Sequence, residues 1–177
     1  MSRPNARAAH TAAASAAQAT QQTGLVVAGH GRHCVVETAD GQRVICHPRG
    51  KKSQSVVGDR VLWQPSQDEG TIEKVQERRN LFYRQDEIRT KSFAANLDQV
   101  LILIAAEPEY SESQLSRALI AAEAEHITPL IALNKSDLPA LHAQAWSRLA
   151  PYRACGYRML SMSLSHDSDA QLQPLIE

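Results

Sequence analysis

The hydrophobic pattern of this chain changes once, near residue 98, and that change limits the folds available to it. Before this point, apolar residues occur in short alternating runs separated by turn residues, which is the pattern of half-buried β-strands. After it, runs such as Gln99–Ala106 are continuously apolar, and amphipathic segments separate them. A continuous apolar run is typical of a strand buried on both faces of a parallel sheet. We therefore expect an all-β region followed by an α/β region.

The first ordered region covers residues 24–84 and contains five candidate strands. The turn residues Ala39-Asp40-Gly41 separate the second from the third, because Gly tolerates the positive φ that hairpin turns require. Five short strands in roughly sixty residues have the size of a small closed barrel of the OB-fold class. The expected strands are Gly24–Ala28, His33–Thr38, Gln42–His47, Arg60–Gln64 and Thr71–Gln76.

The second region covers residues 98–177, after a linker at residues 85–97. Its order predicts strand, helix, strand, helix, strand, which is a doubly wound α/β domain with a parallel sheet. Ser111 and Gln114 form a capping-box pair at the start of the first helix. The expected strands are Gln99–Ala106, Thr128–Leu133 and Tyr157–Met162, and the expected helices are Ser111–Glu125 and Leu141–Tyr152, with Leu115, Leu119, Ala122, Leu141, Ala145, Leu149 and Tyr152 facing inward.

Residues 1–23 contain Arg3 and Arg7, no acidic side chain, and mostly Ala, Ser, Thr and Gln. We expect a disordered, basic, Ala-rich tail; an organellar transit peptide has a similar composition and is the alternative. No apolar run approaches the roughly 20 residues of a membrane span. The three cysteines are odd in number and widely spaced, which fits free thiols in a reducing cytoplasm.

The formal net charge is zero, but the charge is unevenly distributed. Residues 24–90 carry eleven basic and nine acidic side chains, whereas residues 91–177 carry six basic and ten acidic ones. Only the first part is therefore suited to a polyanion such as RNA. A basic loop, Pro48–Ser53, lies between the third and fourth expected strands. It is either a solvated connection or a phosphate-contacting loop, and the residues alone support both interpretations equally.

The motif Asn134-Lys135-Ser136-Asp137 follows directly after the apolar run 129–133. Ligands of open α/β sheets bind at the carboxyl ends of strands, so the motif occupies a position suited to a site. An Asp carboxylate presents two acceptors to the N1–H and N2–H₂ donors of guanine, Asn can donate toward the O6/N7 edge, and the Lys stem can lie across the base. Adenine has no donors at those two positions and would leave the carboxylate unpaired. The motif therefore predicts a guanine-reading site.

A second element supports this prediction. The third expected strand of the α/β region ends at Ser163-Leu164, where a guanine-nucleotide domain carries a Ser-Ala pair whose backbone N–H contacts O6. Leu164 stands where Ala is usual; it does not block a backbone contact, although it crowds the pocket. We therefore add Ser163 and Leu164 to the guanine-binding residues.

Several sequence blocks resemble, in the same order, the ribosome-small-subunit-dependent GTPase family (RsgA), and the resemblance extends over residues 24–177. In that family the GTPase domain is circularly permuted, so that the guanine motif precedes the phosphate-binding loop, and an OB barrel and a zinc-binding domain flank it. The blocks are Gly29-His30-Gly31-Arg32, Arg49-Gly50-Lys51-Lys52, Val57-Gly58-Asp59-Arg60-Val61, Arg78-Arg79-Asn80-Leu81, Asn96-Leu97-Asp98-Gln99-Val100 and Asn134–Asp137.

The resemblance implies a GTP hydrolase that acts in late maturation of the small (30S) ribosomal subunit. Its partners would be that subunit, its rRNA and guanine nucleotide, and we expect a cytoplasmic monomer. The barrel and the connector that follows it would contact rRNA, and Phe82 or Tyr83 in that connector could stack on bases. The candidate RNA-binding residues are Arg32, Arg49, Lys51, Lys52, Arg78 and Arg79.

A phosphate loop of the form G-x-x-x-x-G-K-[ST] does not occur in these 177 residues. Gly50-Lys51 is the only Gly-Lys pair, but Lys52 replaces the Ser or Thr, and Ile45 replaces the first Gly. The resemblance implies that the phosphate loop, the Mg²⁺-associated elements and the zinc site lie beyond Glu177. Because such sites gain most of their affinity from phosphates and Mg²⁺, we expect this chain alone to bind GTP weakly and hydrolyse it negligibly.

Three further interpretations concern other residues or other functions. The histidines and cysteines at 30, 33, 34, 46 and 47 invite a metal site, but they include no C-x-x-C pair, and we expect ordinary barrel residues and no metal in this chain. Trp63 and Trp146 are expected to be core or partly buried packing residues and not base-stacking platforms. The alternatives to the enzyme are a stand-alone rRNA-binding module with a vestigial guanine site and a different N-K-x-D GTPase with an unrelated barrel.

Overall fold

The structure is a computed structural model that describes residues 21–50, 55–66, 69–85, 88–166 and 173. The chain divides into two compact units, which we describe separately. The first contains the residues up to Leu81 together with Thr90–Asn96, and the second contains Phe82–Arg89 and the residues from Leu97 onward. The predicted tail up to residue 20 and the candidate RNA contacts Lys51 and Lys52 lie outside the described residues.

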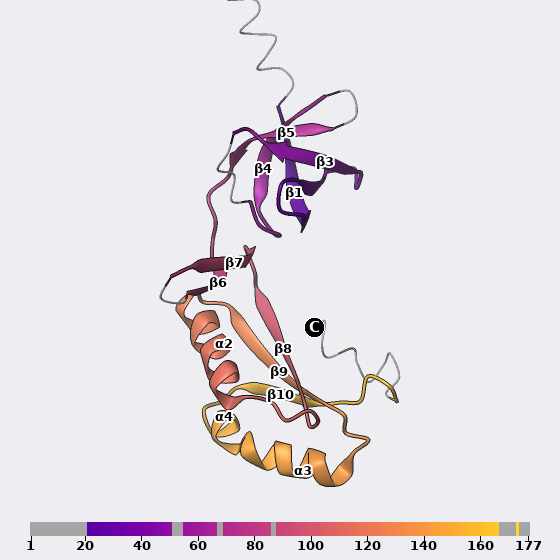
Figure 1. The fold of residues 1–177 in the computed structure, drawn as a ribbon, viewed down its shortest axis with the longest axis vertical. Helices are drawn as coiled ribbons and strands as arrows, with labels where there is room; N and C mark the ends of the chain where they lie inside the picture. The colour runs from indigo at the N-terminus through magenta and orange to yellow at the C-terminus, as the bar shows by residue number, and fades with distance from the viewer. Residues whose placement is uncertain (1–20, 51–54, 67–68, 86–87, 167–172, 174–177) are drawn as a thin grey trace, which may run out of the picture. The chain divides into compact units, whose positions relative to one another are not determined.

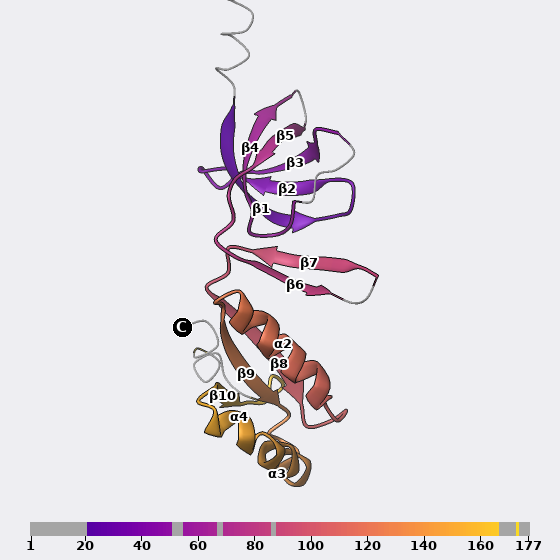
Figure 2. The same ribbon diagram turned by 90° about the vertical axis from the view of Figure 1, so that its left-hand side faces the viewer.

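The first unit contains a closed barrel in the strand order β1-β2-β3-β5-β4 (Figures 1 and 2). β1 pairs antiparallel with both β2 and β4, which closes the barrel, and β3 pairs in parallel with β5. The predicted five-stranded OB-type barrel is therefore confirmed. Its strands are β1 Gln22–Gly29, β2 Cys34–Glu37, β3 Arg43–Pro48, β4 Arg60–Pro65 and β5 Gly70–Val75.

The barrel core forms because alternate side chains of each strand point inward. Trp63 is 2% exposed, as expected for a core residue, and it lies against Gly70, where an added Cβ would come within 2.6 Å of the Trp ring. The turn predicted before β3 is present, with Gly41 at φ 80°. The buried core consists of Val26, Cys34, Val36, Cys46, Val61, Trp63 and Ile72.

Strands β6 (Leu81–Gln85) and β7 (Thr90–Ala95) form a two-stranded sheet. The expected linker at residues 85–97 thus contains strand β7, and β6 falls mainly in the connector that precedes it. The first unit nevertheless includes β7, whose Ala95 N–H donates to the Val57 carbonyl at 2.8 Å. Gly58, at φ 88°, makes this approach possible, since a Cβ there would overlap the Ala95 carbonyl oxygen.

A buried carboxylate, Asp59, holds the segment that leaves the barrel. Its side chain is fully buried and accepts from Arg78 Nε at 2.7 Å and Nη2 at 2.9 Å, and from the Val56 N–H at 2.8 Å. Asn96 extends this network: its side-chain amide donates to the Gly58 carbonyl at 2.8 Å. We call Asp59, Arg78, Asn96 and Gly58 the barrel joint.

The second unit contains a parallel three-stranded sheet in the order β10-β9-β8. The predicted capping pair is present, because Ser111 Oγ accepts from the Gln114 N–H at 3.3 Å at the start of the first helix. The second predicted helix is divided, because Pro151 has no N–H with which to continue it. The elements are β8 Gln99–Ala105, α2 Glu112–Ala124, β9 Thr128–Asn134, α3 Pro139–Arg148, α4 Ala150–Ala154 and β10 Arg158–Ser161.

The helices of the described residues pack on one face of this sheet, against Ile102, Ile104, Ile131, Leu133 and Met159. Figures 1 and 2 show α2 beside β8 and β9. The doubly wound arrangement, with helices on both faces, is therefore not found in the described part of the chain. Successive parallel strands added in one direction place right-handed crossovers on the same side.

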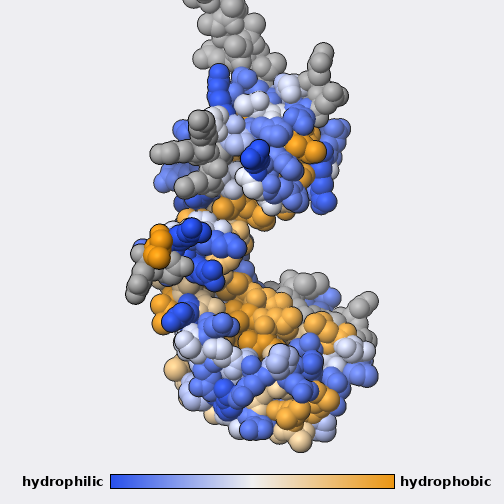
Figure 3. All heavy atoms as spheres, viewed as in Figure 1, coloured by the Kyte–Doolittle hydropathy of each residue, from blue (hydrophilic) through white to orange (hydrophobic). Residues whose placement is uncertain are grey.

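The opposite face of the sheet corrects the prediction that Gln99–Ala106 is buried on both sides. Leu101 is 42% exposed and Leu103 is 50% exposed, because β8 is an edge strand among the described residues. An apolar area is visible over β8 and β9 in Figure 3. Leu141, predicted to face inward, is also 42% exposed, whereas Ala145 and Leu149 are buried as expected.

None of the helices among the described residues is both long and apolar enough to cross a membrane.

Candidate functional site: a guanine-reading loop

The predicted guanine motif begins at the last residue of β9. β9 and β10 are parallel neighbours, with Leu133 opposite Ser161. Their carboxyl ends therefore lie side by side, which brings Asn134–Asp137 next to Ser163-Leu164. The structure thus brings together all six residues that the sequence assigned to guanine.

The backbone between β9 and α3 forms a tight, hydrogen-bonded loop. Lys135 has a left-handed φ of 69°, and the Ser136 N–H donates to the Met162 carbonyl at 3.0 Å. The Leu138 N–H returns to the Lys135 carbonyl at 3.1 Å, and α3 then begins at Pro139, which is favourable at a first helical position. The loop is thereby fixed to the segment that follows β10.

Asp137 is the acidic residue of this loop, and its carboxylate is oriented by a neighbour. Ser163 Oγ donates to Asp137 Oδ1 at 2.5 Å, while Ser163 itself is 2% exposed. This hydrogen bond is the main cause that lowers the pKa of Asp137 below its ordinary value, and His166, with Nε2 at 4.0 Å from Oδ2, adds a smaller lowering effect. The carboxylate is therefore ionised and still one-third exposed.

Asn134 is oriented in the same way from the segment after β10. Its Oδ1 accepts from the Leu164 N–H at 3.0 Å, which leaves the side-chain NH₂ to donate elsewhere. The Leu164 side chain is 50% exposed. Asn134 and Asp137 are thus each held by a residue of the Ser163-Leu164 pair.

The sequence predicts that these six residues lie together, but it does not predict all of their contacts. Ser163 was expected to contribute only through the backbone of the Ser-Ala position, whereas its hydroxyl contacts Asp137. His166 was not expected at the site at all. A serine directly after a strand beside an N-K-x-D loop is a signal that could have predicted the first contact; nothing in the local sequence distinguishes His166.

The candidate RNA-binding arginines lie in different environments. Arg32 is exposed in the β1–β2 turn, and Arg49 at the end of β3 forms an ion pair with Glu73 while 71% of its side chain stays exposed. Arg78 belongs to the barrel joint, and Arg79 donates from Nη2 to the Asn96 carbonyl at 3.0 Å. Arg32, Arg49 and Arg79 are therefore exposed, whereas Arg78 is half-buried against Asp59.

The five residues considered for a metal site are divided between two faces of the barrel. Cys34 and Cys46 are directly opposite each other on β2 and β3 and point into the core, where burial raises the pKa of both thiols, that of Cys46 to about 11. The three histidines lie on the outer face and are exposed or half-buried. Trp146 is partly buried against the core of the second unit, as expected, and His142 and Arg153 stack against its ring.

Comparison with known proteins adds independent information. The family model described as RsgA GTPase matches residues 75–177. The chain is 70% identical over 154 residues to the small ribosomal subunit biogenesis GTPase RsgA of Variovorax paradoxus (strain S110), a match that covers 87% of this chain and 48% of that relative. Its identity to the protein of the same name from Burkholderia pseudomallei (strain K96243) is 53% over 156 residues, covering 85% and 50% of the two chains.

A solved structure agrees with these relatives. The crystal structure of YjeQ from Thermotoga maritima matches with a TM-score of 0.59 and 28% identity, over 81% of this chain and 52% of that chain. The chain thus spans about half the length of the relatives that it matches. With the barrel, the parallel sheet and the guanine motif in the order predicted by the resemblance, the chain belongs to the RsgA GTPase family.

Proposed function

We propose that this chain supplies the base-reading part of a GTPase of small ribosomal subunit biogenesis. The observation that carries the proposal is the Asp137 carboxylate, held at the end of β9 by the Ser163 hydroxyl. Ser163 and Leu164 position both Asp137 and Asn134, so the acceptors needed for guanine are fixed before any nucleotide binds. Relatives that are 70% and 53% identical are named for this function and support the assignment.

The chemistry of this loop favours guanine over other bases. Asp137 would accept from N1–H and N2–H₂, the Asn134 amide would donate toward the O6/N7 edge, and the stem of Lys135 would lie across the ring. Ser136 would connect these residues through its backbone. Adenine would leave the Asp137 carboxylate without donors, and an unpaired polar group of this kind gives strong discrimination.

The family implies GTP and Mg²⁺ as ligands. Triphosphate and Mg²⁺ would supply most of the binding energy and the hydrolytic chemistry, and no residue of this chain is assigned to them. We propose that the phosphate loop and the Mg²⁺-associated elements belong to the part of the relatives that this chain does not span. The structural zinc implied by the resemblance stays a prediction for that same part.

Substitution of Asp137 by Asn tests the base-reading proposal. The amide replaces one acceptor by a donor, so Asp137→Asn should lose preference for guanosine and gain preference for xanthosine. Saturation-transfer NMR with guanosine, xanthosine and adenosine measures this in the purified chain. Asp40→Asn, in an exposed barrel turn, is the matched control. Unchanged preference for guanosine in Asp137→Asn would show that Asp137 does not read the base.

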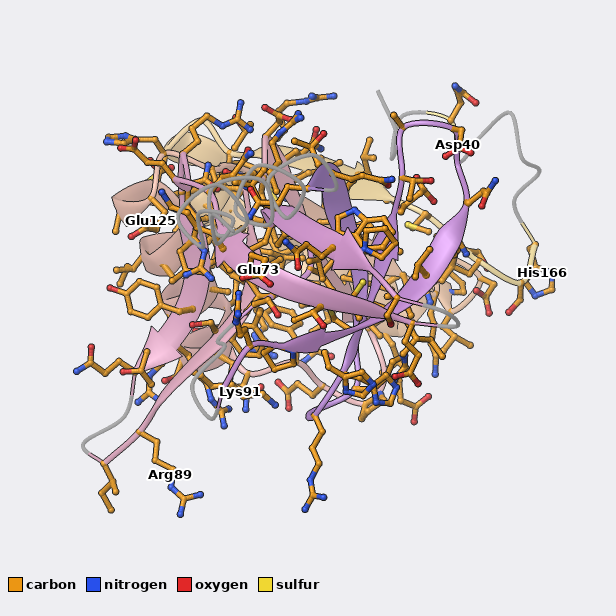
Figure 4. All side chains as sticks on the ribbon, turned by 90° about the horizontal axis from the view of Figure 1, so that it is seen from above. Asp40, Glu73, Arg89, Lys91, Glu125 and His166 are labelled. Carbon is orange, nitrogen blue, oxygen red and sulfur yellow. The ribbon has the colours of Figure 1, made fainter. Side chains whose placement is uncertain are left out.

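We also propose that the barrel side of the chain contacts small-subunit rRNA, with Arg32, Arg49 and the adjacent Lys51 and Lys52 as the main charges. The β6–β7 hairpin adds exposed basic residues, among them Arg89 and Lys91, and Arg89 extends away from the ribbon in Figure 4. Because Arg78 is paired with Asp59 and Arg79 donates to the Asn96 carbonyl, we assign both arginines a structural role first. A monomer acting in the cytoplasm is the form that we propose.

The salt dependence of RNA binding tests this second proposal. Each lost phosphate contact should reduce the slope of log K against log salt by about 0.7 for single strands. Arg32→Glu combined with Arg49→Glu should therefore weaken small-subunit binding and flatten the salt dependence. Arg43→Glu, on the same barrel but paired with Glu37, is the control. If the double variant binds like wild type, the barrel arginines do not contact rRNA.

The alternative is an rRNA-binding module whose guanine site is vestigial. The observation that favours it is the absence of a phosphate-loop motif from these 177 residues. Selective binding of guanosine over adenosine by the chain separates the two. A vestigial site should show no selectivity, whereas a preorganised Asp137 should retain it without hydrolysis.

A further inference from the structure

Three histidines form a row on the outer face of the barrel. His30 lies in the β1–β2 turn, His33 directly precedes β2, and His47 belongs to β3. The ring centroids of His30 and His33 are 5.1 Å apart, and those of His33 and His47 are 5.9 Å apart. At the far end, His47 Nε2 lies 2.9 Å from Glu69 Oε2. We call these three residues the histidine row.

The strand register explains why the rings gather there. Cys34 is opposite Cys46 in the β2–β3 pair, and the continuation of that register places His33 opposite His47. Successive residues of a strand point to opposite faces, so the cysteines enter the core and the histidines lie outside. His30 is brought to them by a turn in which its N–H donates to the His33 carbonyl at 2.9 Å, and Gly31 has a φ of 74°.

The charges around the row decide which ligand it suits. Glu69 offers one carboxylate, Arg32 in the same turn adds a permanent positive charge, and the cysteine thiols beneath are held neutral by their raised pKa. Among the described residues, no three His, Cys, Asp or Glu side chains converge as a metal site requires. The Glu69 carboxylate can neutralise only one imidazolium group. If a second or third histidine of the row is protonated, the row has a net positive charge and favours binding of an external anion.

We propose that His30, His33 and His47 form a protonation-dependent binding site for the phosphodiester backbone of single-stranded RNA. This inference rests on the proposed rRNA contact of the barrel and adds a residue set and a regulation to it. Neutral imidazoles contribute no charge to a phosphate, whereas imidazolium groups donate charge-assisted hydrogen bonds. Histidine changes charge between about pH 5 and pH 8, so RNA affinity should rise as the pH falls through that range, and RNA binding should take up protons.

The test is fluorescence anisotropy of the full 177-residue chain with a labelled single-stranded oligouridylate of about twelve nucleotides. Affinity is measured at about pH 6 and about pH 8 over a series of salt concentrations. The wild-type chain should bind roughly tenfold more tightly at the lower pH. The slope of log K against log salt should steepen there by about 0.7 for each imidazolium that meets a phosphate.

The triple variant His30→Gln/His33→Gln/His47→Gln should lose this pH dependence while keeping its affinity at the higher pH. The matched control is His126→Asn, an exposed histidine in the turn before β9 with a φ of 55°, which Asn tolerates. Circular dichroism verifies the fold at both pH values. If the triple variant does not fold, the single variant His30→Gln, in a turn outside the strands, is compared with wild type instead. Its pH dependence of RNA affinity should be reduced by a smaller amount.

The outcomes separate this inference from the proposed function. Binding that is equal at both pH values, or a pH dependence that survives in the triple variant or disappears in His126→Asn, overturns the histidine site. If binding is nevertheless weakened by Arg32→Glu with Arg49→Glu, the proposed RNA contact of the barrel stands without it. Absence of binding at either pH contradicts both.

Discussion

At the scale of single residues, the guanine loop depends on hydrogen bonds from one strand end to the next. Ser163 is buried and donates to Asp137, and the Leu164 N–H donates to Asn134. Neither donor belongs to the motif that we propose to read the base. The motif therefore contains the side chains proposed to contact the base, while the residues after β10 hold these side chains in position.

Removal of the Ser163 hydroxyl should change the titration of Asp137. The hydrogen bond favours the charged carboxylate and lowers its pKa, so its contribution to stability is present above the ordinary Asp pKa and is lost as the pH falls through the lowered value. In Ser163→Ala the pKa of Asp137 should rise toward the ordinary range, which NMR titration of the carboxyl carbon measures. Ser161→Ala, whose hydroxyl lies near His142 instead, should leave it unchanged. An unaltered pKa in Ser163→Ala would contradict the positioning role.

At the scale of elements, the barrel joint fixes the connector and β7 to the barrel through one buried carboxylate. Arg78→Ala should leave the Asp59 carboxylate buried and uncompensated, and we expect a loss of about 3–5 kcal/mol in the free energy of unfolding of the barrel. Urea unfolding followed by Trp63 fluorescence, in a Trp146→Phe background, reports on the barrel alone.

The control for the joint is an exposed ion pair of the same barrel. Arg43 and Glu37 lie 3.2 Å apart with 70% of the Arg43 side chain exposed. Arg43→Ala should therefore cost about 0–1 kcal/mol. If Arg78→Ala costs no more than Arg43→Ala, the joint does not hold the connector.

The exposed face of β8 is a second feature at this scale. Leu101 and Leu103 are exposed on the side of β8 away from the helices, whereas Ile102 and Ile104 pack under the helices. Exposed apolar edge strands promote association. Any self-association of the monomer at high concentration, measured by sedimentation, should therefore be weaker in Leu103→Lys, while the fold is retained. Ile120→Lys, on α2 with 68% of the native side chain exposed, should have a smaller effect. The opposite ranking would place the associating surface on the helix.

The elements themselves were mostly predictable, and the exceptions have physical causes. Periodicity located the barrel strands, and the Ser111 cap located the start of α2. Hydrophobic periodicity did not predict β6 and β7, because their pairing and the attachment of β7 to Val57 are non-local. It also overestimated the burial of β8, because an apolar run does not reveal whether anything covers both faces. The six candidate guanine residues lie together as predicted, because strand order alone brings two strand ends side by side.

At the scale of the whole molecule, the chain combines a barrel that we propose to contact RNA with the proposed base-reading part of a nucleotide site. The charge distribution agrees with this division, since residues 24–90 are net basic and residues 91–177 are net acidic. A net acidic α/β unit is poorly suited to polyanions. Its affinity for nucleotide should therefore depend on the base and on few other contacts.

Comparison of nucleotides with their nucleoside tests this idea. Because the 177 residues carry no phosphate-loop motif, GTP, GDP and guanosine should bind this chain with weak affinities that agree within a few-fold, roughly 1 kcal/mol. Adenosine should bind more weakly than guanosine, because it would leave the Asp137 carboxylate without a hydrogen-bond donor. Calorimetric titration with and without Mg²⁺ measures the series. GTP binding far tighter than guanosine binding, or dependent on Mg²⁺, would require a phosphate site within these residues and would contradict the division of the site proposed here.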